Sequence, residues 1–366
     1  MSHLLKKEVF AEFINWLGKS HSVIAPVSKE DFTIYKEIAC ADEIDLSENT
    51  LYSPKEHYMP KKEEIFSYKK GFGGKVKADC SFSNKPKAIF GMRMCDVSAL
   101  RKVDKFFSHD IDDPYYQKRR ESLFIIALKC DIEGENCFCS SFEIKDEGYD
   151  LFFQKTKEGF LAAAGSIKGE KMLKSKFFLQ TSKPVDKSLP ITAKKLNLKK
   201  INPEAEVFEK YAKDCMHCCA CNIVCPTCTC FDIYDEPDDS LKTGKRVKTW
   251  DYCQSWDYTK VAGGHVFRKD SKGRFRHRLQ CKFEYMKEEI DEITCTGCGR
   301  CTSICYKGIC DIPEIFSLMQ DPVKSIQIKK GKKQNTKKTK KRATENKKAK
   351  AKKNNNKKQL KKKKKK

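Results

Sequence analysis

The chain has 366 residues, enough for two or three domains. Its formal net charge of +25 suggests a nucleic-acid-binding protein, but the charge is unevenly distributed. Residues 329–366 hold 22 of the 75 Lys and Arg and one of the 50 Asp and Glu, so the rest of the chain carries 53 basic and 49 acidic side chains. The body is therefore nearly neutral, and we expect no specific nucleic-acid partner.

The Lys-rich end of the chain has almost no apolar residue and cannot bury a core. We therefore expect a disordered basic tail over 321–366. Its simplest interpretation is a solvated appendage. The alternative is electrostatic attachment to anionic lipid, nucleic acid or an acidic partner, which salt would weaken.

Twenty cysteines are an extreme number for a chain of this size. In a small secreted protein they would indicate disulfides, but no segment here predicts export. The N-terminal segment predicts an amphipathic helix with apolar residues from Val9 to Leu17 on one face, instead of a signal peptide. The longest apolar run, Leu123 to Leu128, is too short to span a bilayer. We expect a cytoplasmic protein without a transmembrane segment, whose cysteines bind metal.

In the first 200 residues, β-like runs alternate with a helical segment. Strands are expected at 22–27, 32–38, 87–92 and 122–129, followed by a hairpin around Gly159. Residues 96–107 show apolar residues at helical spacing, and strand–helix–strand in this order predicts a right-handed crossover. Residues 165–204 are Lys-rich with three prolines and predict a poorly packed connection.

The composition of the chain changes after residue 200. Cysteines become frequent there, and the apolar patterns predict short helices. The predicted fold is an α/β domain over 1–200, an α-helical two-cluster ferredoxin domain over 201–320 and the disordered tail over 321–366.

Two cysteine motifs in the second region share one spacing. Residues 215–225 and 295–305 each read C-x2-C-x2-C-x3-C, and Pro226 follows the first motif. In two-cluster ferredoxins, three thiolates at this spacing bind one 4Fe–4S cluster and the fourth binds the other cluster. Structural zinc takes its ligands in two pairs and fits the pattern poorly. The chain is therefore predicted to bind two 4Fe–4S clusters.

The exchange of fourth ligands predicts the two ligand sets. The first cluster takes Cys215, Cys218, Cys221 and Cys305, and the second takes Cys295, Cys298, Cys301 and Cys225. Each fourth ligand ties one motif to the other, so iron binding also closes the long loop between them. This long insertion favours a helical ferredoxin over the small β-hairpin type.

Two residues depart from the usual motif. Cys219 stands where glycine is usual, between two ligands, and is interpreted as a bystander. Tyr306 stands where proline usually follows the fourth cysteine, so Cys310 stays open as an alternative to Cys305.

Two further groups of cysteines lie outside these sets. The N-terminal group is a candidate third cluster site and consists of Cys95, Cys130, Cys137 and Cys139. Cys95 and Cys130 follow neighbouring strands whose carboxyl ends would meet, and ligands gather at such ends in open α/β sheets. The alternative is a buried structural set. The other group could build a further metal site or fill space as small packing residues, and consists of Cys228, Cys230, Cys253 and Cys281.

No motif for substrate chemistry accompanies the cysteines. The sequence has no G-x-G-x-x-G turn, no Walker loop and no recognisable nucleophile–base pair. A non-catalytic electron-transfer subunit of an oxidoreductase is therefore the preferred interpretation. The alternative is a self-contained iron–sulfur enzyme with a small-molecule site in its N-terminal domain.

Several segments occur in an order that resembles a known family. They are GMRMCD, DPYYQKRRE, CFC, the first motif with CPTCTCFDI, W-D-x-C, AGGHVFR and CTGCGRC. This order, over roughly residues 85–312, resembles the iron–sulfur electron-transfer subunits typified by that of anaerobic sulfite reductase and by the β subunit of cytoplasmic sulfhydrogenases. The eight motif cysteines match the cluster positions of that family.

The resemblance implies a role in a complex of anaerobic metabolism. The chain would carry electrons between two other subunits, of which one contains flavin and is NAD(P)H-linked and the other is catalytic. We expect the catalytic partner to be a sirohaem sulfite reductase, with a NiFe hydrogenase as the alternative.

Overall fold

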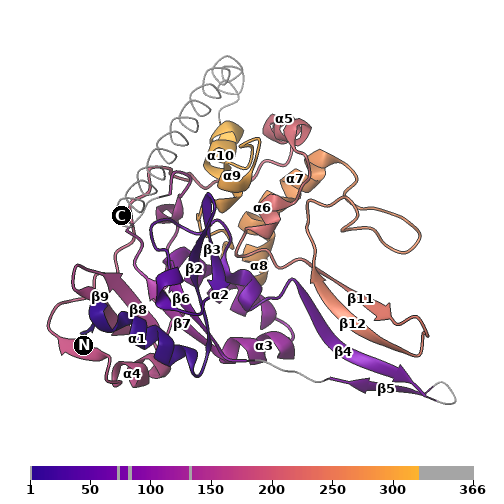
Figure 1. The fold of residues 1–366 in the computed structure, drawn as a ribbon. Helices are drawn as coiled ribbons and strands as arrows, with labels where there is room; N and C mark the ends of the chain where they lie inside the picture. Colours follow the sequence, from indigo (N-terminus) through magenta and orange to yellow (C-terminus); the bar gives the residue numbers. More distant parts are fainter. Residues whose placement is uncertain (1, 72–74, 81–84, 132–133, 321–366) are drawn as a thin grey trace, which may run out of the picture. The chain divides into compact units, whose positions relative to one another are not determined.

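The computed structural model describes residues 2–71, 75–80, 85–131 and 134–320 (Figure 1). The segment Met1–Phe316 forms one compact unit. The predicted basic tail, 321–366, lies outside the described residues.

An eight-stranded mixed sheet forms the N-terminal part of this unit, in the order β10-β1-β9-β8-β7-β6-β2-β3. Its strands are β1 (Ser2–Lys6), β2 (Ser22–Lys29), β3 (Phe32–Glu37), β6 (Lys87–Met92), β7 (Leu123–Leu128), β8 (Leu151–Lys155), β9 (Gly159–Ala164) and β10 (Phe178–Thr181). The four central strands β2, β6, β7 and β8 are parallel, and the outer pairs are antiparallel. The predicted α/β character and the predicted parallel pairing across the 96–107 helix are confirmed.

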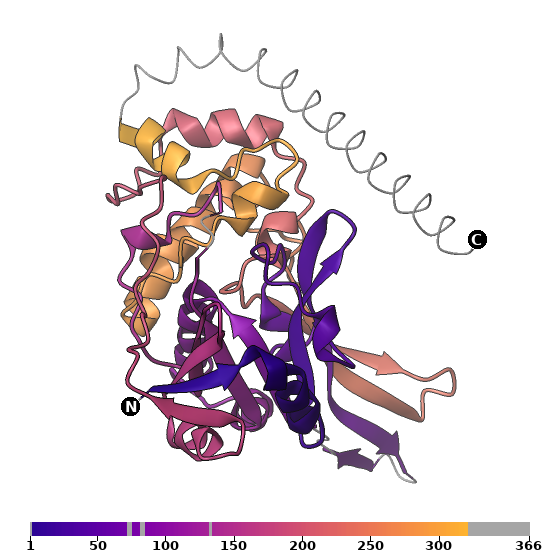
Figure 2. The same cartoon turned by 60° about the vertical axis from the view of Figure 1, so that its left-hand side comes forward.

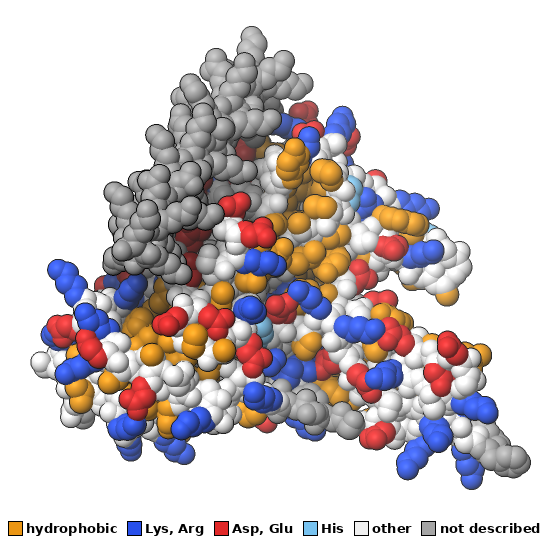
Figure 3. All heavy atoms as spheres, viewed as in Figure 1, with side chains coloured by type: hydrophobic (Ala, Val, Ile, Leu, Met, Phe, Trp, Pro, Cys, Tyr) orange, Lys and Arg blue, Asp and Glu red, His pale blue; other side chains and the backbone are white. Residues whose placement is uncertain are grey.

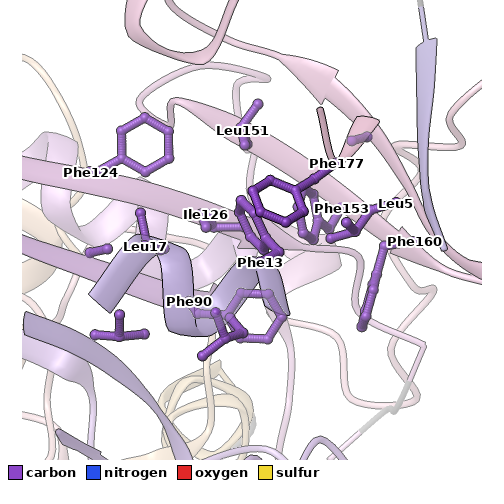
Figure 4. Close-up of a cluster of buried hydrophobic side chains, with 14 of the residues drawn as sticks. Leu5, Phe13, Leu17, Phe90, Phe124, Ile126, Leu151, Phe153, Phe160 and Phe177 are labelled. Atoms are coloured by element: carbon purple, nitrogen blue, oxygen red, sulfur yellow. The ribbon is translucent and has the colours of Figure 1, made fainter. Parts of the chain in front are cut away.

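Helices cover both faces of this sheet. Helix α1 (Lys7–Gly18) packs its apolar stripe on one face, where Phe13 joins Phe90 and Ile126 in a buried cluster (Figure 4). Helices α2 (Met94–Phe107) and α3 (Pro114–Glu121) cover the other face, where Ile89 and Ile125 are buried. Successive strand residues point to opposite faces, and both faces are covered. All six residues of β7 are consequently buried and apolar.

The segment 165–204 is more ordered than its composition predicts. It contains helix α4 (Ile167–Leu173) and strand β10, which pairs antiparallel with β1 at the start of the chain. Both strands are too short to show an alternating pattern, and each is stabilised by a partner that is far away in sequence. The prediction of a poorly packed connection was therefore wrong for 167–181.

A second, antiparallel sheet joins the two halves of the chain, in the order β11-β12-β4-β5. Its strands are β4 (Lys62–Lys70), β5 (Val76–Asp79), β11 (Phe231–Pro237) and β12 (Thr243–Trp250). Strand β4 pairs with β12, which lies in the loop between the two cysteine motifs. The sheet projects from the body as an arm in both cartoon views (Figures 1 and 2).

The cysteine-dense region contains short helices and the β11–β12 hairpin. The helices are α5 (Glu206–Asp214), α6 (Ala220–Ile223), α7 (Ser271–Gln280), α8 (Met286–Ile290), α9 (Arg300–Ile304) and α10 (Ile312–Gln320), with a π-helical turn over Cys281–Tyr285. The predicted helical character therefore holds for part of this region, and the hairpin was not predicted. Over the described ranges, no helix combines the length and apolar character that a bilayer span requires.

Candidate iron–sulfur centres

The two cysteine motifs have the same local backbone. In each, the residue two places after the first cysteine and the residue directly after the second cysteine have positive φ. The values are 51° at His217 and 59° at Cys219, against 66° at Gly297 and 71° at Gly299. Short helices α6 and α9 then begin at matching positions. The second motif makes this turn with glycine, whereas the first makes it with residues that carry side chains. Positive φ has a conformational cost for such residues.

One cavity is lined by cysteines of both motifs. They are Cys215, Cys218 and Cys221 of the first motif and Cys305 of the second, together with Cys219 and Cys310. The thiol of Cys310 is in hydrogen-bonding contact with the thiols of both Cys221 and Cys305. The four cysteines predicted for the first cluster therefore lie around one cavity, and the alternative fourth residue lies among them.

A second cavity contains the other predicted set. It is lined by Cys225, Cys295, Cys298 and Cys301. Three of these thiols are buried, whereas Cys218 in the first cavity is exposed. The last cysteine of each motif thus lies with the first three cysteines of the other motif.

Within the described ranges, no three His, Cys, Asp or Glu side chains close around a point as a single metal ion requires, and this includes the motif cysteines. A 4Fe–4S cube takes one thiolate on each of four iron atoms, so its ligands are spaced more widely than those of one ion. The fit to a cluster therefore depends on the number and type of donors and on the surrounding charge.

Buried cations surround the second cavity. Arg278 and Lys282 both line it and are each 4% exposed. Arg278 donates to the carbonyl of Cys221 at 2.9 Å, and Lys282 donates to Thr227 Oγ1 at 3.0 Å. Burial alone would lower the pKa of Lys282, but neighbouring cysteines, Cys225 first, hold this pKa well above its usual range. Buried positive charge needs a counter-charge, and an anionic thiolate-bound cluster would supply it.

The third predicted set lies in a cavity of about 500 Å³ beside the carboxyl ends of β6 and β7. Its thiols are those of Cys95, Cys130, Cys137 and Cys139. Cys298 and Arg300 of the second motif line the same cavity, and the Cys137 thiol lies 3.7 Å from the carbonyl oxygen of Cys298. Burial raises the pKa of Cys137 to about 11 and that of Cys139 to about 12. The set predicted from sequence is thus brought together, next to the second cavity.

Two glycines let the Cys-Phe-Cys loop approach the second motif. The backbone N–H of Phe138 donates to the carbonyl of Gly297 at 2.8 Å. A Cβ at Gly297 would lie 2.6 Å from the backbone of Cys139, and a Cβ at Gly299 would lie 2.3 Å from the carbonyl oxygen of Asn136. Both contacts are too close for any side chain, so these glycines allow the N-terminal loop and the motif to pack directly.

The charged residues of the site were identified only in part from sequence. A basic, aromatic-bearing stretch between the motifs ends at Arg278 and is as typical of a solvated surface as of a face that offsets a cluster's negative charge. Lys282 lies beyond this stretch. Arg300 stands inside the second motif and Asp96 directly follows Cys95, and both are buried. The adjacency of Arg300 and Asp96 to cysteines was the sequence feature that could have identified them as site residues.

The comparisons with known proteins also indicate iron–sulfur binding by this region. Residues 214–309 match the family model of a 4Fe–4S dicluster domain. Sulfhydrogenase 2 subunit beta of Pyrococcus furiosus is 31% identical over 320 residues, which cover 82% of this chain and 93% of that relative. The chain belongs to the sulfhydrogenase β-subunit family of iron–sulfur proteins. No solved structure matches it.

Membership of the sulfhydrogenase β-subunit family confirms the resemblance drawn from the ordered motifs. The named relative is a hydrogenase subunit, which corresponds to the alternative of the two expected catalytic partners.

Proposed function

We propose that the chain is a non-catalytic electron-transfer subunit of a hydrogenase-type oxidoreductase in the cytoplasm. It would pass electrons between a NiFe hydrogenase and a flavin-containing, NAD(P)H-linked subunit. The alignment with a sulfhydrogenase β subunit over 93% of that relative carries the proposal. A sirohaem sulfite reductase is the second candidate partner, supported by the order of the motifs.

Two 4Fe–4S clusters would be bound with exchanged fourth ligands. The first would use Cys215, Cys218, Cys221 and Cys305, and the second Cys295, Cys298, Cys301 and Cys225. This assignment is supported by the two cavities, each of which is lined by cysteines of both motifs. Cys310 would then donate its thiol hydrogen bond to a ligand of the first cluster, which would tune its potential.

The first cluster is proposed as the point of electron exchange with a partner. Met216 and Tyr306 line its cavity and are 68% and 89% exposed. Apolar side chains also gather over the region of α5–α7 on the face in Figure 3. Exposed apolar surface of this kind marks protein–protein contact sites. The second cluster is more deeply buried and would carry electrons inward.

The N-terminal α/β part, residues 1–200, is proposed to contribute a third cluster site beside a helical ferredoxin domain over 201–320. Support comes from the cavity that Cys95, Cys130, Cys137 and Cys139 line and from Arg93 and Arg300 at its wall. A Cys95→Ala/Cys137→Ala variant should lose about four irons per chain after anaerobic reconstitution. An unchanged iron content would leave these cysteines as a structural set.

Anaerobic isolation of the full chain with its native partners tests the function. The complex should contain flavin and nickel, measured by fluorescence and elemental analysis, and NAD(P)H should bleach the iron–sulfur absorbance of the chain. Sirohaem absorbance without nickel would favour the sulfite reductase. A chain that purifies alone and is not reduced by any flavoprotein fraction would contradict the electron-transfer role.

A further inference from the structure

Two cysteines outside the proposed cluster sets lie against one buried amide, and a third contacts one of them. The Nδ2 of Asn222 lies 3.2 Å from the Cys253 sulfur and 3.7 Å from the Cys228 sulfur. The thiols of Cys230 and Cys253 are in hydrogen-bonding contact with each other. Asn222 and Cys253 are 1% and 4% exposed, whereas Cys228 and Cys230 are half-buried.

A fourth thiol lies close to this group. Cys281 begins the π-helical turn after α7, three residues after Arg278, whose Nη1 lies 3.4 Å from the Cys228 sulfur. Cys228 and Cys230 come just before β11, and Cys253 comes just after β12. The base of the hairpin and the end of α7 therefore bring four cysteines together from three segments of the chain.

Three buried cations adjoin the four cysteines. Lys55, Arg278 and Lys282 are 2%, 4% and 4% exposed. Lys55 Nζ donates to the carbonyl of Cys228 at 3.0 Å, and Arg278 Nη1 lies 3.4 Å from the Cys228 sulfur. No carboxylate of the described chain lies within ion-pair distance of any of the three. Because an uncompensated buried charge is strongly destabilising, this region requires an anion.

The second motif cluster alone does not account for this arrangement. Lys282 lies near Cys225, but Lys55 contacts Cys228 and stacks over the ring of Trp250 at 4.0 Å. Neutral thiols used for packing would leave Lys55, which does not line the second cavity, without a counter-charge. N–H donors directed at sulfur, as from Asn222 and Arg278, stabilise metal-bound thiolate.

We propose that Cys228, Cys230, Cys253 and Cys281 bind a further 4Fe–4S cluster. The thiolate-bound cube carries a net negative charge, which Lys55 and Arg278 balance. The Cys228 thiol is in hydrogen-bonding contact with Cys225, a proposed ligand of the second motif cluster. The additional cluster therefore lies beside the motif clusters and is an extra one-electron centre next to them.

Paired variants of the full chain test the site after anaerobic reconstitution. Cys228→Ala/Cys253→Ala should lose about four irons and four acid-labile sulfides relative to the parent protein. The matched control Cys40→Ala/Cys80→Ala removes two exposed thiols and should keep the full content. Because the result is a difference between variants, it does not depend on the number of clusters assigned to the motifs or to the N-terminal set.

The single variants Cys281→Ser and Cys219→Ser test which cysteine is the fourth ligand. They also keep the proposal testable if the double variant does not fold. Cys281→Ser should give a three-iron EPR signal that the parent lacks, and Cys219→Ser should not. Unchanged iron and EPR in both Cys281→Ser and the double variant would overturn the proposal. One zinc per chain that is lost with Cys228 and Cys253 would also overturn it, since the site would then hold a single ion.

Discussion

The guanidinium of Arg300 donates hydrogen bonds of 2.5 and 2.8 Å to the two carboxylate oxygens of Asp96. Arg300 lies between Cys298 and Cys301, and Asp96 directly follows Cys95. The two side chains are 6% and 0% exposed. The second motif and the N-terminal thiol set are therefore joined by a buried ion pair.

Asp96→Asn should destabilise the protein by about 3–5 kcal/mol, because it removes the carboxylate that pairs with the buried Arg300. Anaerobic urea unfolding followed by tryptophan fluorescence measures the effect. Glu12→Gln is the control, since its ion pair with Lys176 is exposed and should contribute less than about 1 kcal/mol. Equal effects of both variants would show that the Asp96 pair does not stabilise the junction.

The positive-φ positions of the two motifs predict opposite effects of two substitutions. Gly299→Ala should destabilise the protein and loosen the 136–139 loop, because its Cβ would meet the carbonyl oxygen of Asn136. Cys219→Gly should stabilise it by about 1 kcal/mol, since glycine adopts positive φ without the Cβ penalty. Urea unfolding gives both values. Loss of iron on Cys219→Gly would contradict the bystander role of that thiol.

Ligand exchange predicts which cluster each fourth cysteine affects. Cys225→Ser should perturb the EPR signal that Cys298→Ser perturbs, and Cys305→Ser should perturb the signal that Cys218→Ser perturbs. Loss of one thiolate converts a cube to a three-iron form or shifts its potential. If Cys225→Ser instead damages the signal identified by Cys218→Ser, the motifs are self-contained.

Cys310→Ser separates the two candidates for the fourth ligand of the first cluster. With Cys305 as the ligand, this variant should keep the cube and shift its potential, because only a hydrogen bond to a ligand changes. A three-iron signal in Cys310→Ser, together with an intact cube in Cys305→Ser, would assign Cys310 as the ligand. Redox titration followed by EPR distinguishes these outcomes.

The burial of His57 leads us to expect a loss of stability in mild acid. Burial lowers the pKa of His57 to about 4, against about 6.5 for an unfolded histidine. The unfolded chain therefore binds this proton more readily. The contribution of neutral His57 to the free energy of unfolding is complete above about pH 6.5 and is lost as the pH falls towards about 4. Between about pH 7.5 and pH 5.5 the loss should be about 1 kcal/mol. His57→Gln should reduce this pH dependence of urea unfolding, and an unchanged dependence would contradict it.

Local patterns predicted the elements whose partners are close in sequence. The helical spacing around Phe13 and Leu17 and the strands flanking 96–107 were identified because side-chain period alone defines them. Strand β1 was missed because its pairing with β10 spans most of the N-terminal half. The β4–β12 pairing was missed for the same reason.

The candidate sites were predicted unevenly. Cysteine spacing predicted which cysteines line the same cavities, because a cube would impose a fixed spacing on neighbouring ligands. Spacing carries no information on where a cation is buried, so Lys55, Arg278 and Lys282 could not be distinguished from surface residues. Their role follows from contacts with cysteines in other segments.

The shared β4–β12 ladder also constrains how the protein is made. Glu64 of β4 forms an ion pair with Lys245 of β12, 181 positions later. During synthesis, β4 therefore leaves the ribosome long before its partner exists, and its edge remains open to other strands. The cysteines that follow β12 are translated later still. A cluster whose ligands come from both motifs can accordingly be assembled only after this whole region has been translated.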